Sequence, residues 1–180
     1  MTSRIILKLL GWNIEGKLPL IRKYVIIAAP HTSMLDFILG KLFLQSLSLN
    51  AKILMKKELF FFPLGILIKS MGGIPVDRNN RNQTIDKMVD MFATSESLKL
   101  IIAPEGTRKM VTSWRTGFYH IALKAGVPIL PVYGDYRRKV FGIGELFYPS
   151  GEIDKDISTL QNLYKDITPF YPSRFNSLRT

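Results

Sequence analysis

The stretch YVIIAAPHTSMLD, residues 24–36, decides the fold of this chain. Its first six residues form a continuous apolar run, which is typical of a strand that is covered on both faces of a parallel sheet. Residues 33–49 then carry apolar side chains at helical spacing, so we expect a helix there. A buried strand that leads directly into a helix predicts an α/β layered domain, and such domains place ligands at the carboxyl ends of strands.

The rest of the chain continues this alternation. Further strands are expected at residues 51–55, 74–76, 98–103 and 127–133, with one or two more within 140–148. Further helices are expected at residues 58–71, 84–93, 115–124 and 157–167. Two prolines, Pro128 and Pro131, suggest an edge position or an irregular end for their strand. We therefore predict one α/β domain over residues 24–180, with a mixed, mostly parallel sheet flanked by helices.

Composition limits the function. The 180 residues hold 25 Lys and Arg against 14 Asp and Glu, which gives a net charge of +11. This charge predicts an anionic partner, such as nucleic acid, anionic lipid headgroups or a phosphorylated small molecule. The chain has no Cys, which excludes a disulfide scaffold and a Cys nucleophile, and with two His in all we expect no metal site.

Residues 1–23 precede the predicted domain and are expected to form an amphipathic, membrane-associating segment. Within them, residues 1–12 predict a short helix in which Arg4 and Lys8 share one face. Such a helix either lies in a membrane interface or packs on its own domain, and the pattern leaves both open. No charge-free run reaches the roughly 18–20 residues that a spanning helix needs.

The first candidate for chemistry is the pair His31 and Asp36, which directly follows the first buried strand. If His31 lies in the loop and Asp36 in the first helical turn, the carboxylate can accept the Nδ1–H of the imidazole. Nε2 is then free to act as a base near neutral pH. The alternative is structural, because Ser33 and Asp36 also fit a capping box, with Ser33 as N-cap.

Two glycine-containing stretches are candidates for anion binding. In PEGTR, residues 104–108, Gly106 permits a close backbone approach and Arg108 can hold a phosphate. In GGIPVDR, residues 72–78, Arg78 can face an anion. The alternatives are a strand–helix turn with a solvated Arg108 and a turn with a local ion pair.

Taken in order, four motifs resemble the glycerolipid (lysophospholipid) acyltransferase family, in particular its 1-acyl-sn-glycerol-3-phosphate acyltransferase-like members. That family carries H-x4-D, G-x-I-x-[IV]-D-R, P-E-G-T-R and V-P-[IVL]-[IVL]-P-[VI]. Here these motifs stand at residues 31–36, 72–78, 104–108 and 127–132, so the resemblance covers most of the chain. The sequence departs from the family pattern at three flanking positions, which are Pro30, Ala103 and Lys109.

The resemblance implies direct acyl transfer, in which His31, oriented by Asp36, takes the proton of an acceptor hydroxyl. The resulting alkoxide attacks a thioester carbonyl, and no covalent acyl-enzyme is needed. The residues expected to bind or support the acceptor, its phosphate above all, are Ser33, Arg78, Glu105, Gly106, Thr107 and Arg108.

The resemblance also implies the partners. The acyl donor is acyl-CoA or acyl carrier protein, with no further cofactor, and the acceptor is a lysophospholipid, foremost 1-acylglycerol-3-phosphate, which gives phosphatidic acid. We expect peripheral binding to an anionic membrane at the cytoplasmic face of the inner membrane, and no nucleic acid. Two alternatives stay open: another acceptor, such as a lyso-amino-acid lipid, and a non-catalytic basic lipid-binding domain.

Overall fold

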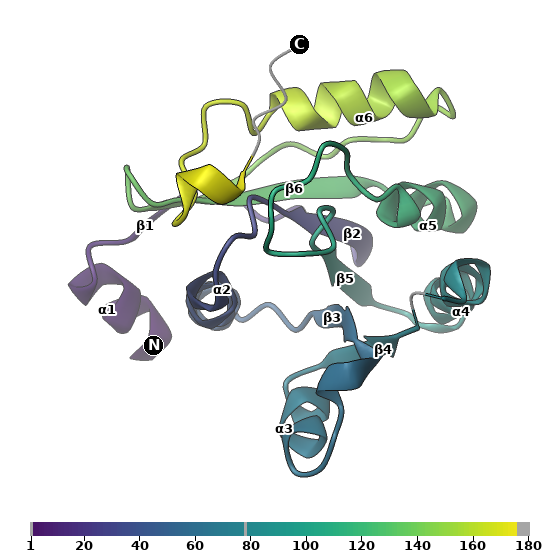
Figure 1. The fold of residues 1–180 in the computed structure, drawn as a ribbon, viewed down its shortest axis with the longest axis horizontal. Coiled ribbons are helices and arrows are strands. Elements are labelled where there is room, and N and C mark those ends of the chain that lie inside the picture. Colours follow the sequence, from purple (N-terminus) through teal and green to yellow (C-terminus); the bar gives the residue numbers. More distant parts are fainter. Residues whose placement is uncertain (1, 78, 176–180) are drawn as a thin grey trace.

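The computed structural model describes residues 2–77 and 79–175 and contains a seven-stranded sheet between helices (Figure 1). In spatial order the strands are β1 (Asn13–Glu15), β7 (Val140–Ile143), β6 (Ile129–Asp135), β2 (Lys23–Ala28), β5 (Leu98–Ile102), β3 (Lys52–Lys56) and β4 (Gly73–Val76). All neighbouring strands pair in parallel except β6 and β7, which are antiparallel. The predicted mixed, mostly parallel α/β domain is therefore confirmed.

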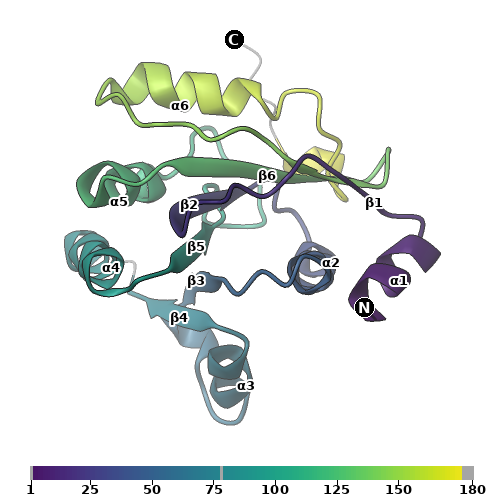
Figure 2. The ribbon, with the colours of Figure 1, turned by 180° about the vertical axis from the view of Figure 1, so that it is seen from behind.

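Helices cover both faces of the sheet, as Figures 1 and 2 show from opposite sides. They are α1 (Thr2–Leu9), α2 (Met34–Ser46), α3 (Leu64–Ser70), α4 (Arg81–Thr94), α5 (Gly117–Ala125) and α6 (Ile153–Asn162), with 3-10 turns η1 (Lys57–Leu59) and η2 (Pro172–Arg174). Because side chains alternate along β2, Val25 and Ile27 pack toward α4, α5 and α6, while Tyr24 and Ile26 pack toward α1 and α2.

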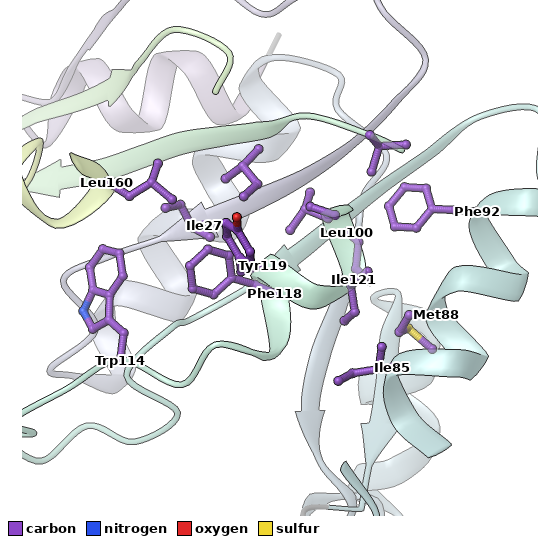
Figure 3. Close-up of a cluster of buried hydrophobic side chains, with 14 of the residues drawn as sticks. Ile27, Ile85, Met88, Phe92, Leu100, Trp114, Phe118, Tyr119, Ile121 and Leu160 are labelled. Carbon is purple, nitrogen blue, oxygen red and sulfur yellow. The ribbon is translucent and has the colours of Figure 1, made fainter. Parts of the chain in front are cut away.

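The cluster on the α4–α5–α6 side is a buried hydrophobic core. Figure 3 shows side chains of this cluster from both strands and helices, among them Ile27, Leu100, Ile85, Met88, Phe92, Phe118, Ile121 and Leu160. Each of these side chains is at most 5% exposed. This core holds β2 and β5 rigidly side by side, so the loops at their carboxyl ends are held next to each other.

The strand expected at residues 127–133 lies inside the sheet, so the predicted edge position is wrong. β6 pairs with β2 on one side and β7 on the other. Its prolines fit because neither has to donate a ladder hydrogen bond. Pro128 precedes β6, and its carbonyl accepts from Val25 N at 3.0 Å. Pro131 precedes the part of β6 that pairs with β7, and its carbonyl accepts from Gly144 N at 2.9 Å.

Helix α1 packs on its own domain, which was one of the two alternatives for the N-terminal segment. Leu7 on α1 and Trp12 just after it are buried in the cluster shared with α2, so the segment packs on its own domain. The opposite side of α1 is exposed, with Ile5 at 57% and Leu9 at 82%. Within the described residues, no helix is both long and apolar enough to span a bilayer.

The structure differs from the expected elements in three places. The helix expected at residues 58–71 is broken into η1 and α3, and Pro63, which has no N–H to donate, stands at the N-cap of α3. α6 begins at Ile153 rather than at residue 157. β1, three residues long, was not predicted, because three residues are too few to show an alternation.

Candidate active site

His31 lies in the short loop that joins the carboxyl end of β2 to α2. The sequence builds this loop through a capping box: the Ser33 hydroxyl accepts from Leu35 N at 3.1 Å, and Asp36 at the third helical position accepts from Ser33 N at 2.7 Å. The predicted N-cap is thus confirmed, and a cap of this kind contributes about 1 kcal/mol to stability. Ser33 is 6% exposed and acts here as the cap.

Asp36 does more than cap the helix, because its carboxylate also faces the imidazole of His31. Asp36 Oδ2 lies 3.4 Å from His31 Nδ1 and accepts from Thr32 N at 2.6 Å. Asp36 Oδ1 accepts from the hydroxyl of Tyr136 at 2.6 Å. The carboxylate therefore faces Nδ1 of the imidazole, which leaves Nε2 as the nitrogen available for proton transfer.

The charge of Asp36 follows from its hydrogen bonds. Burial acts to raise the pKa of Asp36, but the hydrogen bonds it accepts, first from His31 and then from Tyr136, outweigh burial and lower the pKa below its usual value. Asp36 is consequently a carboxylate at neutral pH, as a group that has to stabilise an imidazolium must be.

Glu105, in the loop after β5, is buried beneath the His31 loop. Its Oε1 accepts from the backbone N–H of His31 at 2.9 Å, and the residue is 4% exposed. Its Oε2 is buried with no hydrogen-bond partner among the described residues. Burial raises the pKa of Glu105 to about 7. The sequence placed Glu105 among the acceptor-binding residues, whereas in the structure its carboxyl group anchors the backbone that carries His31.

The other residues of the PEGTR loop that follow Glu105 lie at a cavity. Gly106 has a φ of +64°, a left-handed conformation that favours glycine, and a Cβ there would lie 2.6 Å from Cδ of the Arg115 side chain. Beyond it, Thr107 and Arg108 line a cavity together with Gly106. The backbone turns at this point, since Gly106 N donates to the carbonyl of Ala103 at 3.1 Å.

That cavity has a volume of about 960 Å³, and both His31 and Asp36 line it. Most of its wall is apolar and comes from β2, β3, α2 and α3, including Phe37, Leu44, Leu54, Leu67, Ile68 and Met71. Three arginines also line it, Arg81, Arg108 and Arg115. Among residues 2–77 and 79–175, none of the three forms an ion pair with a carboxylate. The cavity thus offers an apolar volume and positive charge beside an imidazole.

The predicted site residue in the GGIPVDR stretch needs separate comment. Arg78 lies outside the described residues. Its neighbour Asp77 lines the cavity and forms an ion pair with Lys57 at 2.7 Å, so the Asp of the GGIPVDR stretch does make a local ion pair. No group of three or more His, Cys, Asp or Glu side chains in the described part of the chain could hold a metal ion.

Sequence reasoning missed two residues of this site, Tyr136 and Arg81. Tyr136 directly follows β6, as His31 follows β2, so the rule that ligands gather at strand ends could have found it. Arg81 is the first residue of α4 and lies in a polar stretch that carries no motif.

Comparison with known proteins points to one family. The Acyltransferase family model matches residues 12–134. The chain is 30% identical over 133 residues to the 1-acyl-sn-glycerol-3-phosphate acyltransferase of Haemophilus influenzae, covering 69% of this chain and 54% of that protein. It is 32% identical over 135 residues to the enzyme of the same name from Saccharomyces cerevisiae, covering 69% of this chain and 43% of the yeast protein. The chain therefore spans about half the length of these relatives.

A solved structure supports the same fold. The crystal structure of the 1-acyl-sn-glycerophosphate (LPA) acyltransferase PlsC from Thermotoga maritima superposes with a TM-score of 0.61. The match covers 89% of this chain and 73% of that one, at 19% sequence identity.

Proposed function

This chain belongs to the acyltransferase family, and from that premise we propose that it transfers a fatty acyl group from a thioester to the hydroxyl of a lysophospholipid. The acceptor that we propose is 1-acylglycerol-3-phosphate, and the product is phosphatidic acid. One observation carries the proposal: a His31–Asp36 pair lines a largely apolar cavity that three arginines also line. The apolar wall can accommodate an acyl chain, the arginines a phosphate, and His31 a hydroxyl that is to be deprotonated.

The chemistry follows from the orientation of His31. Its Nε2 takes the proton from the acceptor hydroxyl while Asp36, facing Nδ1, stabilises the imidazolium that forms. The acceptor oxygen attacks the thioester carbonyl and forms a tetrahedral intermediate. When that intermediate collapses, the carbon–sulfur bond breaks, and the imidazolium returns its proton to the departing thiolate. No acyl group is attached to the protein at any step.

Acceptor recognition rests on the guanidinium groups. We propose that Arg108 binds the acceptor phosphate, supported by Thr107 and by Arg78, and that Arg81 and Arg115 add to the positive field. A guanidinium can bind two phosphate oxygens at once, which favours arginine for this role. The acyl donor in this proposal is acyl-CoA or acyl carrier protein, and no other cofactor takes part.

A screen of acceptors tests this proposal. The protein is incubated with isotope-labelled acyl-CoA or acyl carrier protein and a panel of lysolipids, including 1-acylglycerol-3-phosphate and a lyso-amino-acid lipid. Mass spectrometry then identifies the lipid product, and a thiol reagent measures thioester consumption. We expect labelled phosphatidic acid and acceptor-dependent release of thiol. Product from another lysolipid alone would correct the acceptor, and no thioester consumption with any acceptor would favour a lipid-binding domain.

We further propose that the protein binds peripherally to anionic membrane at the cytoplasmic face of the inner membrane. The exposed apolar side of α1, which includes Ile5 and Leu9, supports this, as do Arg4 and Lys8 on the same helix. Each basic residue near an anionic surface contributes about 1 kcal/mol to binding, and salt weakens this attraction.

Flotation with liposomes measures this binding. Anionic vesicles should carry more protein than neutral ones at low salt, and Leu9→Glu should reduce flotation because Leu9 is 82% exposed and contributes little to folding. Leu163→Glu, a change on an exposed side chain after α6, is the matched control. Equal flotation with both vesicle types at low salt would contradict the electrostatic part of this proposal.

A further inference from the structure

Tyr136 reaches the His31 motif from a distant part of the chain. It follows β6, and its hydroxyl donates to Asp36 Oδ1 at 2.6 Å across a sequence separation of 100 residues. The hydroxyl remains a donor, because burial and the neighbouring Asp36 raise the pKa of Tyr136 far above its ordinary range. Tyr136 is outside all four motifs by which the chain resembles its family.

The two oxygens of Asp36 have different surroundings. Oδ2 accepts from Thr32 N and Ser33 N and faces His31. Oδ1 accepts from the hydroxyl of Tyr136, which is its hydrogen-bond donor among the described residues. Without the hydroxyl of Tyr136, one edge of the carboxylate would have no donor in that part of the chain. Oδ2 would still accept from Thr32 N and Ser33 N, but the hydrogen bond on Oδ1 that helps to fix the carboxylate plane relative to the imidazole would be lost.

The ring of Tyr136 is itself held on several sides. It packs edge-on against Trp12, with ring centroids 5.0 Å apart, and against Phe170 at 5.2 Å. The backbone N–H of Tyr136 donates to the carbonyl of Thr168 at 2.8 Å. The segments after α1 and after α6 therefore hold the ring of Tyr136 in place, and this places its hydroxyl beside Asp36.

We propose that Tyr136 is a positioning residue for the acyl transfer proposed above: its hydroxyl fixes the plane of Asp36, and Asp36 in turn fixes the imidazole of His31. This inference rests on the proposed function for its kinetic consequence, although the positioning itself does not depend on it. Tyr136 touches no reacting atom in this role. It acts through Asp36, so its effect must disappear when Asp36 is absent.

Tyr136→Phe removes the hydroxyl and keeps the ring contacts with Trp12 and Phe170. A hydrogen bond to a charged group has a strength that corresponds to about a 10- to 100-fold change in an equilibrium or rate constant. We expect kcat to fall by about that factor, with KM for the lysolipid and for the thioester within about twofold of wild type, because no substrate contact is lost. In the Asp36→Ala background, Tyr136→Phe should cause no further loss.

The chain contains a matched control in Tyr119. Its hydroxyl donates to Asp156 Oδ2 at 2.8 Å, which is the same chemical pair, buried in the core away from the cavity. Tyr119→Phe should lower stability without lowering kcat per folded molecule. A wild-type kcat in Tyr136→Phe would overturn the proposal, as would a loss confined to KM, or an undiminished loss in the Asp36→Ala background.

A second readout needs no enzymatic activity, so it separates failure of this inference from failure of the proposed function. The chain has two His, and the 15N NMR signals of the two imidazoles are readily assigned with His120→Ala. We expect Tyr136→Phe to move the ring signals of His31, and Tyr119→Phe to leave them in place. If the His31 signals are the same in wild type and Tyr136→Phe, Tyr136 does not position this imidazole, whatever the protein catalyses.

Discussion

The segments that follow β2 and β5 each contribute a carboxyl group to the same backbone stretch, and these two groups behave oppositely: Asp36 in the first turn of α2 is partly buried, and Glu105 in the loop after β5 is buried. Asp36 accepts hydrogen bonds from Thr32 N, Ser33 N and the Tyr136 hydroxyl, and its pKa is lowered. Glu105 accepts from His31 N, while its other oxygen has no partner among the described residues, and burial raises its pKa to about 7.

The comparison teaches that burial alone does not set the charge of a carboxyl group. At the partly buried Asp36, hydrogen bonds from His31, Tyr136, Ser33 and Thr32 to the charged form outweigh the loss of water; at the more deeply buried Glu105, the fewer hydrogen bonds do not. The two groups therefore suit different roles. Asp36 can stabilise positive charge on His31, and Glu105 holds the backbone of His31 as an anchor that changes charge near neutral pH.

Removing the imidazole of His31, the residue that both Asp36 and Glu105 contact, should have the largest effect on the rate of acyl transfer. General-base catalysis contributes about 10²- to 10⁴-fold, so we expect His31→Ala to lower acyl transfer by at least that factor. The rate of thiol release from acyl-CoA in the presence of lysolipid measures it. His120→Ala is the control, because His120 lies on α5 and does not line the cavity. Near-normal turnover in His31→Ala would contradict the mechanism.

Glu105→Gln should abolish the pH dependence of stability that the raised pKa of Glu105 causes. Since the folded state raises the pKa of Glu105 from 4.5 to about 7, the folded protein binds this proton more tightly than the unfolded chain does. The stability contribution is fully present below pH 4.5 and is lost as the pH rises to 7. The difference amounts to about 3 kcal/mol in the free energy of unfolding.

Urea denaturation at several pH values tests this sign. Glutamine can still accept from His31 N and carries no charge, so the free energy of unfolding of Glu105→Gln should lack this dependence. Relative to wild type, the variant should therefore gain stability between pH 5 and pH 8. Parallel stability curves for the two proteins would show that Glu105 keeps an ordinary pKa.

The smallest effect should come from the outer end of the β5 loop, which we propose binds substrate rather than performing chemistry. Arg108→Lys should raise KM for the lysophospholipid by about 10- to 100-fold, because an ammonium cannot bind two phosphate oxygens at once. KM for the thioester should stay nearly unchanged. Arg138→Lys is the control, since Arg138 pairs with Glu15 and does not line the cavity. A rise in the thioester KM instead would assign Arg108 to the donor.

Much of the fold could be predicted from local patterns. The apolar run that forms β2 and the amphipathic spacing of α4 and α5 are properties of consecutive residues, and they appear in the structure within a few positions of where the sequence places them. Gly126 ends α5 with a φ of +63°, as its position after the helical pattern indicates. The order of strands could not be obtained in this way, since it depends on contacts between distant segments.

The same division applies to the candidate site. The capping box and the approach of His31 to Asp36 are contained in six consecutive residues, so their spacing was sufficient to predict them. The role of Glu105 was not predictable, because its partner, the N–H of His31, lies 74 residues away.

By itself the sequence determined that this is a basic α/β domain of the acyltransferase family with a His31–Asp36 pair at a strand end, because hydrophobic periodicity, caps and motifs are local. Tertiary structure alone decided which groups surround that pair. It set β6 inside the sheet despite Pro128 and Pro131, and so carried Tyr136 to Asp36. The physical reason is that hydrogen bonds and burial depend on distances in space, and the packing of β2 between β5 and β6 sets those distances.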